Sequence, residues 1–389
     1  MEKGTAFDVA RLRAAEFPWS EAGEKIYLNN AGTGPLPRRT VAALNDWAER
    51  RTKPWEVPDR EVLFPALQRV RERCARLVGA RSSEIALVNN TSFGLNLAAR
   101  SLPLQRGDVV LVSDREFPSV IYAWRAIERE RGIRLRIVPI RDGLLDEDAL
   151  LQALQETDVR VVTVSWVSFA TGQRIDLQRL GRACRERGVF LVVDAMQGLG
   201  VVPFDVTTCG ADIVACGGYK WLLSPWGAGF VYVREALIMQ LTPPIVGWFV
   251  GPASEDYGRL LDYDLRFYAS ARRFEVMALQ AQEFIAMGRS LDLLSELGTH
   301  AVADHIEMLT GRIIDWVRTR SDMRLITPAD SNQRAGIVCV APADPRVASQ
   351  RLSEAGVVHS LREGAIRFAP HCYNTVEEID AAFSVLADA

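Results

Sequence analysis

Between residues 85 and 233 the sequence alternates short apolar runs with segments of helical periodicity. The apolar runs cover residues 85–90, 109–114, 134–140, 159–166, 189–195, 212–218 and 229–233. Most of them are rich in valine and isoleucine and lack the polar alternation of a half-exposed strand. Strands that are covered on both faces read as unbroken apolar runs, so this pattern predicts an α/β fold with a parallel or mostly parallel sheet.

The pattern changes after about residue 240. Helical periodicity covers residues 272–288, 301–320, 348–356 and 375–388, and short apolar runs stand at 323–327, 336–341 and 365–369. Short strands mixed with helices predict a smaller α+β domain. Because 389 residues are too many for one typical core, we expect a large domain over residues 21–250 and a small domain formed by residues 1–20 and 251–389.

The composition excludes several classes of function. A formal charge of −3 gives no general attraction to nucleic acid or anionic lipid. No apolar run approaches the roughly 20 residues that span a bilayer, and the first residues lack the apolar core of a signal peptide, so we expect a cytoplasmic protein. The six cysteines form no C-x-x-C pair and the four histidines form no ligand cluster, so neither a disulfide framework nor a metal site is expected.

Three polar residues follow two of the predicted strands. Asp194 ends one strand, Gln197 stands three residues later, and Lys220 lies just past the next strand. Ligands of such sheets bind beyond the carboxyl ends of the strands, so Asp194 and Lys220 are expected to face a common ligand. The alternative is a salt bridge between strand ends.

A second polar element is the pair Thr91–Ser92, at a predicted helix start directly after a strand. Hydroxyl groups and free backbone N–H groups at a helix N-terminus can bind a phosphate, although ordinary N-capping is the alternative. A lysine, a carboxylate and an anion site together fit pyridoxal 5′-phosphate (PLP). This cofactor needs a lysine for its Schiff base, an acid beside its ring nitrogen and a site for its phosphate.

With these residues the chain resembles the class V aminotransferase family of fold-type I PLP enzymes, which includes cysteine desulfurases, selenocysteine lyases, kynureninase and isopenicillin N epimerase. The resemblance runs from residues 27–37 to residues 367–380, and its most specific feature is D-x-x-Q at 194–197 followed by Lys220. It implies a large domain with a sheet of the seven-stranded type, an amino-acid substrate and a homodimer.

Carried over by position, the resemblance assigns the main cofactor contacts. Lys220 resembles the Schiff-base lysine and Asp194 the partner of the pyridine nitrogen. Gln197 resembles the glutamine at the ring hydroxyl. Thr91 and Ser92 resemble the phosphate-binding pair.

The same comparison by position implies five further contacts. Phe117 stands where the family places the aromatic ring that stacks on the cofactor. Ser168 stands beside the position of an asparagine near the ring hydroxyl, and the hydroxyl of Tyr219 is expected to replace a lost phosphate contact. Asn30 falls in the segment that approaches the substrate, and Arg367 matches the arginine that binds the substrate α-carboxylate through two hydrogen bonds.

Departures from the family pattern argue against cysteine desulfurase activity. Desulfurases stack a titratable histidine where this chain has Phe117. Their persulfide cysteine lies in a loop before the carboxylate arginine, but only six residues separate Ser360 from Arg367 and none is cysteine; Cys372 follows. The sequence at 273–277, RFEVM, also lacks the family's threonine that reaches a phosphate across the dimer.

The resulting hypothesis is a PLP-dependent aminotransferase. A β-lyase of the cysteine or selenocysteine type and an amino-acid epimerase stay open as alternatives, because both share the first chemical steps. A catalytically silent PLP-fold binding protein is the non-enzyme alternative, against which intact Lys220, Asp194 and Arg367 argue. A nicotinamide enzyme is disfavoured, because the run GLGVVP at 198–203 lacks the third glycine of the dinucleotide motif and Pro203 interrupts the helix.

Overall fold

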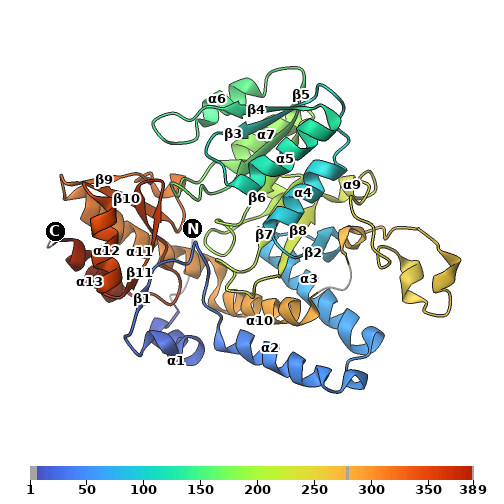
Figure 1. The fold of residues 1–389 in the computed structure, drawn as a ribbon, viewed down its shortest axis with the longest axis horizontal. Coiled ribbons are helices and arrows are strands. Elements are labelled where there is room, and N and C mark those ends of the chain that lie inside the picture. Colours follow the sequence, from blue (N-terminus) through green and yellow to red (C-terminus); the bar gives the residue numbers. More distant parts are fainter. Residues whose placement is uncertain (1–6, 277–279, 388–389) are drawn as a thin grey trace.

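A seven-stranded sheet forms the centre of the computed structural model, which describes residues 7–276 and 280–387 (Figure 1). The strand order is β2-β8-β7-β6-β5-β3-β4. β8 runs opposite to the other six strands. The strands are β2 (Ile85–Val88), β3 (Val109–Ser113), β4 (Arg134–Val138), β5 (Val159–Ser165), β6 (Phe190–Asp194), β7 (Ile213–Gly217) and β8 (Gly229–Val233). The predicted mostly parallel sheet is confirmed.

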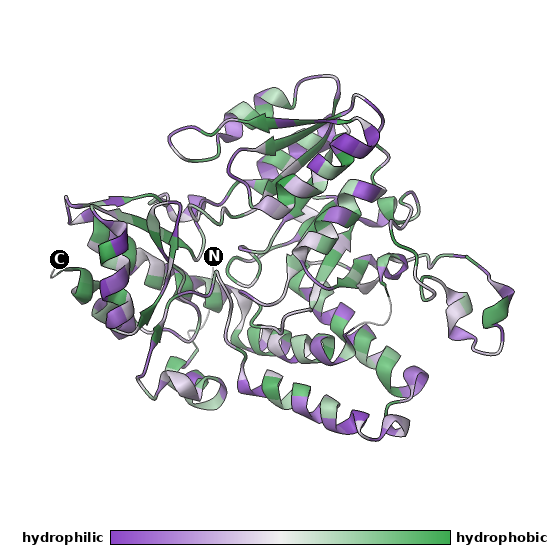
Figure 2. Ribbon diagram, in the orientation of Figure 1, coloured by the Kyte–Doolittle hydropathy of each residue, from purple (hydrophilic) through white to green (hydrophobic). Residues whose placement is uncertain are grey.

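Helices cover both faces of this sheet. Val110 and Val112 of β3 pack in a core with α4 (Thr91–Ser101) and α5 (Pro118–Arg131). Leu111, between them, packs in the opposite core with α3 (Phe64–Val78), α6 (Glu147–Ala153), α7 (Leu177–Glu186) and α10 (Ala281–Leu297). Successive side chains of a strand point to opposite faces, so strands between two cores must be apolar throughout. Figure 2 shows these strands as mainly hydrophobic.

A second, smaller unit lies at the left of Figure 1. Its antiparallel sheet has the order β12-β13-β10-β9, and a separate core joins the sheet to three helices. The strands are β9 (Met323–Leu325), β10 (Val338–Pro342), β12 (Ser360–Arg362) and β13 (Ala365–Phe368), and the helices are α11 (Thr299–Arg318), α12 (Pro345–Glu354) and α13 (Val376–Ala387). The predicted α+β character of this region is confirmed.

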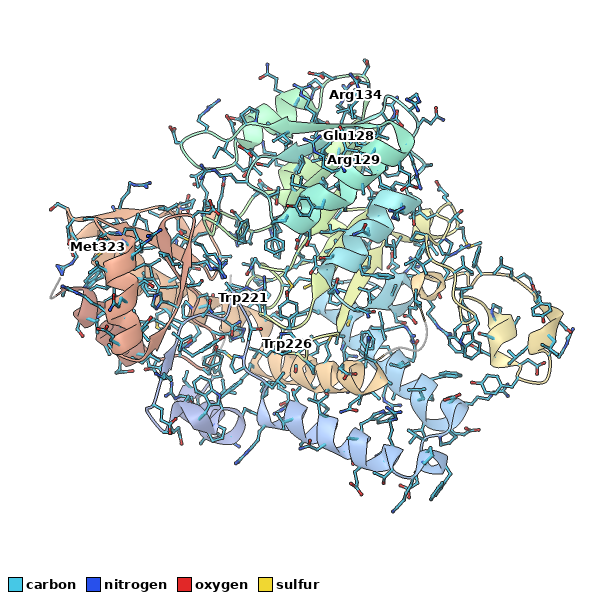
Figure 3. The ribbon with its side chains drawn as sticks, viewed as in Figure 1. Glu128, Arg129, Arg134, Trp221, Trp226 and Met323 are labelled. Atoms are coloured by element: carbon cyan, nitrogen blue, oxygen red, sulfur yellow. The ribbon has the colours of Figure 1, made fainter. Side chains whose placement is uncertain are left out.

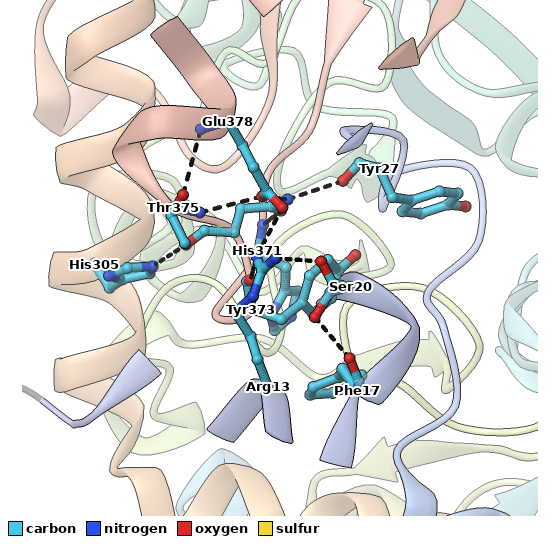
Figure 4. Close-up of polar contacts among 10 residues, drawn as sticks. Arg13, Phe17, Ser20, Tyr27, His305, His371, Tyr373, Thr375 and Glu378 are labelled. Atoms are coloured by element: carbon cyan, nitrogen blue, oxygen red, sulfur yellow. Dashed lines mark hydrogen bonds and ion pairs between the residues drawn. The ribbon is translucent and has the colours of Figure 1, made fainter. Parts of the chain in front are cut away.

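The N-terminal segment contacts the small unit. The guanidinium of Arg13, on α1 (Val9–Glu16), donates to Glu378 and to the carbonyl oxygen of Tyr373 (Figure 4). After α1, strand β1 (Ile26–Tyr27) pairs in parallel with β11 (Val357–Val358). Helix α1 and strand β1 therefore both contact the C-terminal part of the chain.

Helix α10 lies against the large unit. It packs on α2 (Arg38–Arg51) and α3, and the hydroxyl groups of Thr40 and Ser290 lie 2.7 Å apart. The predicted domain limits stay a prediction, and these contacts favour placing α10 with the large domain. Two short helices, α8 (Val206–Cys209) and α9 (Glu235–Ile238), complete the α-helices of the described residues. No helix in this part of the chain is long and apolar enough to cross a membrane.

The helix predicted at 272–288 begins later than expected. Residues 271–274 form a short 3₁₀ turn, Glu275 is extended, residues 277–279 lie outside the described residues, and α10 begins at Ala281. The cause is a buried ion pair: the Glu275 carboxylate accepts from Arg71 Nε at 2.7 Å and Nη2 at 2.6 Å. It also accepts from the backbone N–H of Leu87 at 2.9 Å, which links α3, β2 and the segment before α10.

We predict that Glu275→Gln destabilises the protein strongly, because it leaves the Arg71 guanidinium buried without a counter-charge. Breaking a buried pair in this way costs about 3–5 kcal/mol of unfolding free energy. Urea unfolding followed by circular dichroism measures the loss.

Asp380→Asn is the matched control for this variant. Asp380 makes the same two-pronged contact to Arg312, with both hydrogen bonds at 2.8 Å, but on the surface. An exposed pair contributes about 1 kcal/mol or less. Equal losses in the two variants would contradict the assignment of Arg71–Glu275 as the pair that holds this region.

Candidate active site

A cavity of about 320 Å³ lies at the carboxyl ends of β5, β6 and β7, beside the N-terminus of α4. It is lined by Asn89, Asn90, Thr91, Ser92, Phe117, Ser119, Ser165, Val167, Phe169, Asp194, Met196, Gln197, Tyr219, Lys220, Trp226 and Gly227. A larger cavity of about 600 Å³, near Arg60 and Glu255, contains none of the residues predicted for the site. The smaller cavity is therefore the candidate site.

Lys220 lies just past the end of β7 with its side chain almost fully buried. Its Nζ stands 5.6 Å from the ring centroid of Phe117, and no carboxylate of the described residues forms an ion pair with it. The alternative of a strand-end salt bridge is thus excluded. Burial lowers the pKa of Lys220 to about 8, and the charge of Arg367 lowers it too, which favours the neutral, nucleophilic amine.

Asp194 is the last residue of β6 and is buried in the cavity wall. Its Oδ1 accepts from the N–H of Met196 at 2.9 Å, and its Oδ2 accepts no hydrogen bond from the described residues. Burial raises the pKa of Asp194 to about 6, although the charge of Lys220 opposes this. The carboxylate therefore has one oxygen available for a cationic N–H donor, which would favour its ionised form.

The amide of Gln197 has a fixed orientation. Its Oε1 accepts from Trp221 Nε1 at 2.7 Å, and its Nε2 donates to the carbonyl oxygen of Ala31 at 3.2 Å. An indole nitrogen can only donate, so the amide oxygen must face Trp221. One amide hydrogen of Gln197 stays available for an acceptor in the cavity.

The N-terminus of α4 forms the polar end of the cavity. The capping residue is Asn90, whose Oδ1 accepts from the N–H of Phe93 at 2.9 Å, so Thr91 and Ser92 are the first residues inside the helix. N–H groups at these positions have no acceptor within a helix. The Thr91 hydroxyl accepts from Gly217 N–H at 2.9 Å, and the Ser92 hydroxyl lies 2.7 Å from that of Ser119. Ordinary capping by Thr91 is excluded, and the arrangement suits an anion.

The rings of Phe117, Phe169 and Tyr219 form another part of the wall. Phe117 precedes α5, is 40% exposed, and packs edge-on against Phe169 with 5.2 Å between ring centroids. Ser168, which was predicted here, does not line the cavity. Its hydroxyl accepts instead from the N–H groups of Ala170 and Thr171, both at 3.3 Å, in a turn that directs Phe169 to the cavity.

Asn30 and Arg367 lie behind the wall rather than in it. Asn30 is fully buried, with its Nδ2 donating to the carbonyl oxygen of Lys220 at 3.2 Å and its Oδ1 accepting from Tyr373 at 2.8 Å. Arg367 donates from Nε to the Ser360 hydroxyl at 3.1 Å and from Nη1 to the carbonyl oxygen of Phe169 at 3.0 Å.

Arg367 has no carboxylate partner among the described residues, although Glu363 and Glu378 are near it in the sequence. Glu378 is paired with Arg13 at 2.7 Å. Burial lowers the pKa of Arg367 to about 10, so this guanidinium is a buried cation that a carboxylate ligand would stabilise.

Sequence reasoning missed two residues of this region. Glu116 holds Ser165, because its carboxylate accepts from both the N–H (2.9 Å) and the hydroxyl of Ser165, which pairs in register with Asp194. Burial raises the pKa of Glu116 to about 7. Trp226 (labelled in Figure 3) lines the cavity and donates from its indole N–H to the Thr33 hydroxyl at 3.2 Å. Its position in the turn SPWGAG was the available signal.

The residues of the cavity fit PLP. A buried amine that burial keeps partly neutral, a carboxylate with one open oxygen, a helix N-terminus that begins with Thr91 and Ser92, and an exposed aromatic face lie around one space. They match the aldehyde, the ring nitrogen, the phosphate and the ring face of that cofactor in turn.

Comparisons with known proteins agree with this fit. Residues 26–382 match the family model "Aminotransferase class-V". The chain is 30% identical to a probable cysteine desulfurase of Methanothermobacter thermautotrophicus, covering 92% of each chain, and 30% identical to isopenicillin N epimerase of Streptomyces clavuligerus, covering 94% of each. A solved C-DES mutant with glycine covalently linked to its PLP cofactor has the same fold, with a TM-score of 0.88 at 22% identity over 97% of this chain and 99% of that one. The chain belongs to the class V aminotransferase family of PLP-dependent enzymes.

Proposed function

We propose that this enzyme is an aminotransferase that acts on an α-amino acid. The observation that supports this best is the small number of titratable side chains that line the cavity. Among the described lining residues, Lys220, Asp194 and Tyr219 alone titrate, and burial raises the pKa of the Tyr219 phenol above its ordinary value. One amine on one side of the cavity suits a reaction in which a proton leaves the substrate Cα and is returned on the same face.

Sulfur transfer has no nucleophile in this site. All six cysteines are buried, and none of them lines the cavity in the described part of the chain. Burial raises the pKa of Cys339 to about 12 and moves that of Cys372 in the same direction. A persulfide carrier must be an accessible thiolate, so these thiols do not suit desulfurase chemistry.

Each assigned residue has one task in the proposed reaction. When bound, PLP supplies an electron sink for the charge that develops at the substrate Cα. The Lys220 amine would hold the cofactor and would move the substrate α-proton, and the Asp194 carboxylate would favour the protonated ring nitrogen. The N–H groups of Thr91 and Ser92 would bind the phosphate. Arg367 binds the substrate α-carboxylate and so orients the Cα–H bond.

Epimerisation is the second candidate, because a relative named isopenicillin N epimerase is 30% identical over 94% of this chain. A β-lyase shares the same first steps. Purified protein with a panel of amino acids tests all three reactions, scored separately for keto acid, for pyruvate with ammonia, and for α-deuterium exchange. Keto acid supports the aminotransferase. Exchange with racemisation and no keto acid would replace it by the epimerase, and no product at all would favour a silent binding protein.

We also propose a homodimer in the cytoplasm. A segment of the large unit exposes Trp248, Leu261 and Tyr263, whose side chains are typical of subunit interfaces. Six free cysteines without a disulfide suit a reducing compartment. Sedimentation of the PLP-loaded protein measures its oligomeric state.

The pKa of Lys220 predicts a pH dependence for cofactor attachment. The amine must be neutral to attack the aldehyde, so the rate of PLP binding to the stripped protein should rise with pH and level off above about 8. Arg367→Ala removes a positive neighbour and should move the midpoint upward. Stopped-flow absorbance measures the rate, and a rate that falls as pH rises through this range would contradict the assignment of Lys220.

Asp194→Asn should separate cofactor binding from chemistry. An amide keeps the shape of the carboxylate but cannot hold the ring nitrogen protonated, so the variant should retain PLP and exchange the substrate α-proton about 10²-fold more slowly or worse. Deuterium exchange measured by NMR gives the rate. Exchange near the wild-type rate at equal PLP content would refute the role of Asp194.

Arg367→Ala should weaken the binding of α-amino acid substrates without loss of PLP. Losing the carboxylate contact should raise KM by at least about tenfold and also lower kcat, because the Cα–H bond loses its orientation. Arg324→Ala removes an exposed arginine from β9 of the same sheet and is the matched control. The same change in both variants would show that Arg367 has only a structural role.

A further inference from the structure

The cavity wall outside the assigned cofactor contacts has a polar part, formed by Asn89, Asn90, Ser119 and Ser165, and an apolar part that is largely aromatic. Trp226, Phe169, Val167 and Met196 form the apolar part, and the Phe117 ring assigned to the cofactor borders it through its contact with Phe169. Trp226 is 73% exposed, so most of its surface is free to contact a ligand, and its hydrogen bond to Thr33 fixes one edge of the ring. A fixed, exposed indole at a cavity wall presents a flat apolar face at little cost in side-chain entropy.

The charges of the residues that line the cavity also indicate a substrate with an uncharged side chain. Among the described residues that line the cavity, Lys220 and Asp194 alone are charged, and both have tasks at the cofactor. A charged group on the substrate side chain would find no opposite charge beside Phe169, Val167 or Trp226. Transferring such a group from water to an apolar wall without a partner is unfavourable.

Phe169 links the two ends of the substrate. Its ring lines the cavity, whereas its carbonyl oxygen accepts from Arg367 Nη1 at 3.0 Å. The residue that contributes an aromatic surface therefore also helps to hold the guanidinium assigned to the α-carboxylate. A substrate anchored at Arg367 is placed beside the aromatic wall.

We propose that the substrate is an α-amino acid with an aromatic or large apolar side chain, which packs against Trp226 and Phe169. This inference rests on the proposed aminotransferase function and specifies its substrate class. Apolar area removed from water gives the selectivity, and the ring of an aromatic substrate adds stacking or edge contacts.

The test compares phenylalanine, alanine and aspartate with the PLP-loaded enzyme. Wild-type kcat/KM for keto-acid formation should be at least about tenfold higher for phenylalanine than for the other two. Trp226→Ala should lower the value for phenylalanine by about tenfold and leave alanine within about twofold, whereas Trp226→Phe, which keeps a ring, should recover most of the loss. Tyr122→Ala is the matched control, because Tyr122 is 70% exposed and does not line the cavity.

A binding measurement provides a readout that does not depend on turnover. 3-Phenylpropanoate carries the carboxylate and the ring but no amine, so it cannot react with the cofactor. Calorimetry of the PLP-loaded protein should give a dissociation constant about tenfold weaker for Trp226→Ala than for wild type, and an unchanged value for Tyr122→Ala.

The outcomes distinguish the two proposals. Faster turnover of aspartate than of phenylalanine, or an equal effect of Trp226→Ala on alanine and phenylalanine, overturns the substrate class and leaves the aminotransferase intact. No keto acid from any of the three overturns the aminotransferase. In that event the binding of 3-phenylpropanoate still tests the aromatic site. If Trp226→Ala leaves its dissociation constant unchanged, the aromatic site is overturned as well.

Discussion

The loop that carries Lys220 is fixed by hydrogen bonds from distant parts of the chain, and the geometry of the whole site depends on it. Its backbone carbonyl groups at residues 219, 220, 221 and 223 accept from Gly34 N–H, Asn30 Nδ2, His371 Nε2 and Ser290 Oγ. Leu223, in this loop, adopts a positive φ of 53°, a strained conformation for leucine that these contacts maintain. A Cβ at Gly34 would lie 2.2 Å from the Lys220 carbonyl oxygen, so this approach requires glycine. The N-terminal segment, α10 and the C-terminal segment thus all position one amine.

Burial without pairing gives the site its electrostatic character. Asp194 and Lys220 share a cavity but form no ion pair, so burial raises the pKa of the acid to about 6 and lowers that of the amine to about 8. Both shifts disfavour the charged forms. A ligand that brings a cationic N–H to Asp194 and a carbonyl carbon to Lys220 relieves both costs. Behind them His371 stays neutral, because burial lowers its pKa to about 4, and it accepts from Cys372 N–H while donating to the Trp221 carbonyl oxygen.

The predictable part of the site was the part encoded by local sequence. Thr91, Asp194 and Lys220 stand at or just past the ends of predicted strands, and the ends of parallel strands meet at one edge, so their convergence on one cavity followed from the pattern. Errors arose where partners distant in sequence decide the conformation. Glu275 is held by Arg71, 204 residues away, which delays the start of α10, and Glu116 meets Ser165 across 49 residues. A turn at Ser168 decides that Phe169, and not Ser168, lines the cavity. The periodicity of the sequence does not predict the conformation of such a turn.

The family shares its fold across several reactions, so the side chains around Lys220 must select among them. A phenylalanine stands at position 117, where desulfurases place a histidine, and a phenyl ring can stack but cannot carry a proton. In the proposed aminotransferase, Lys220 is then the group that both removes and returns the α-proton, and it works from one side of the cavity. Return to the opposite face of Cα, which epimerisation requires, would need a second acid; of the described lining residues only Tyr219 could supply one, and its raised pKa makes the phenol a weak donor. Return on the same face requires only the Lys220 amine already in place, so this arrangement favours transamination.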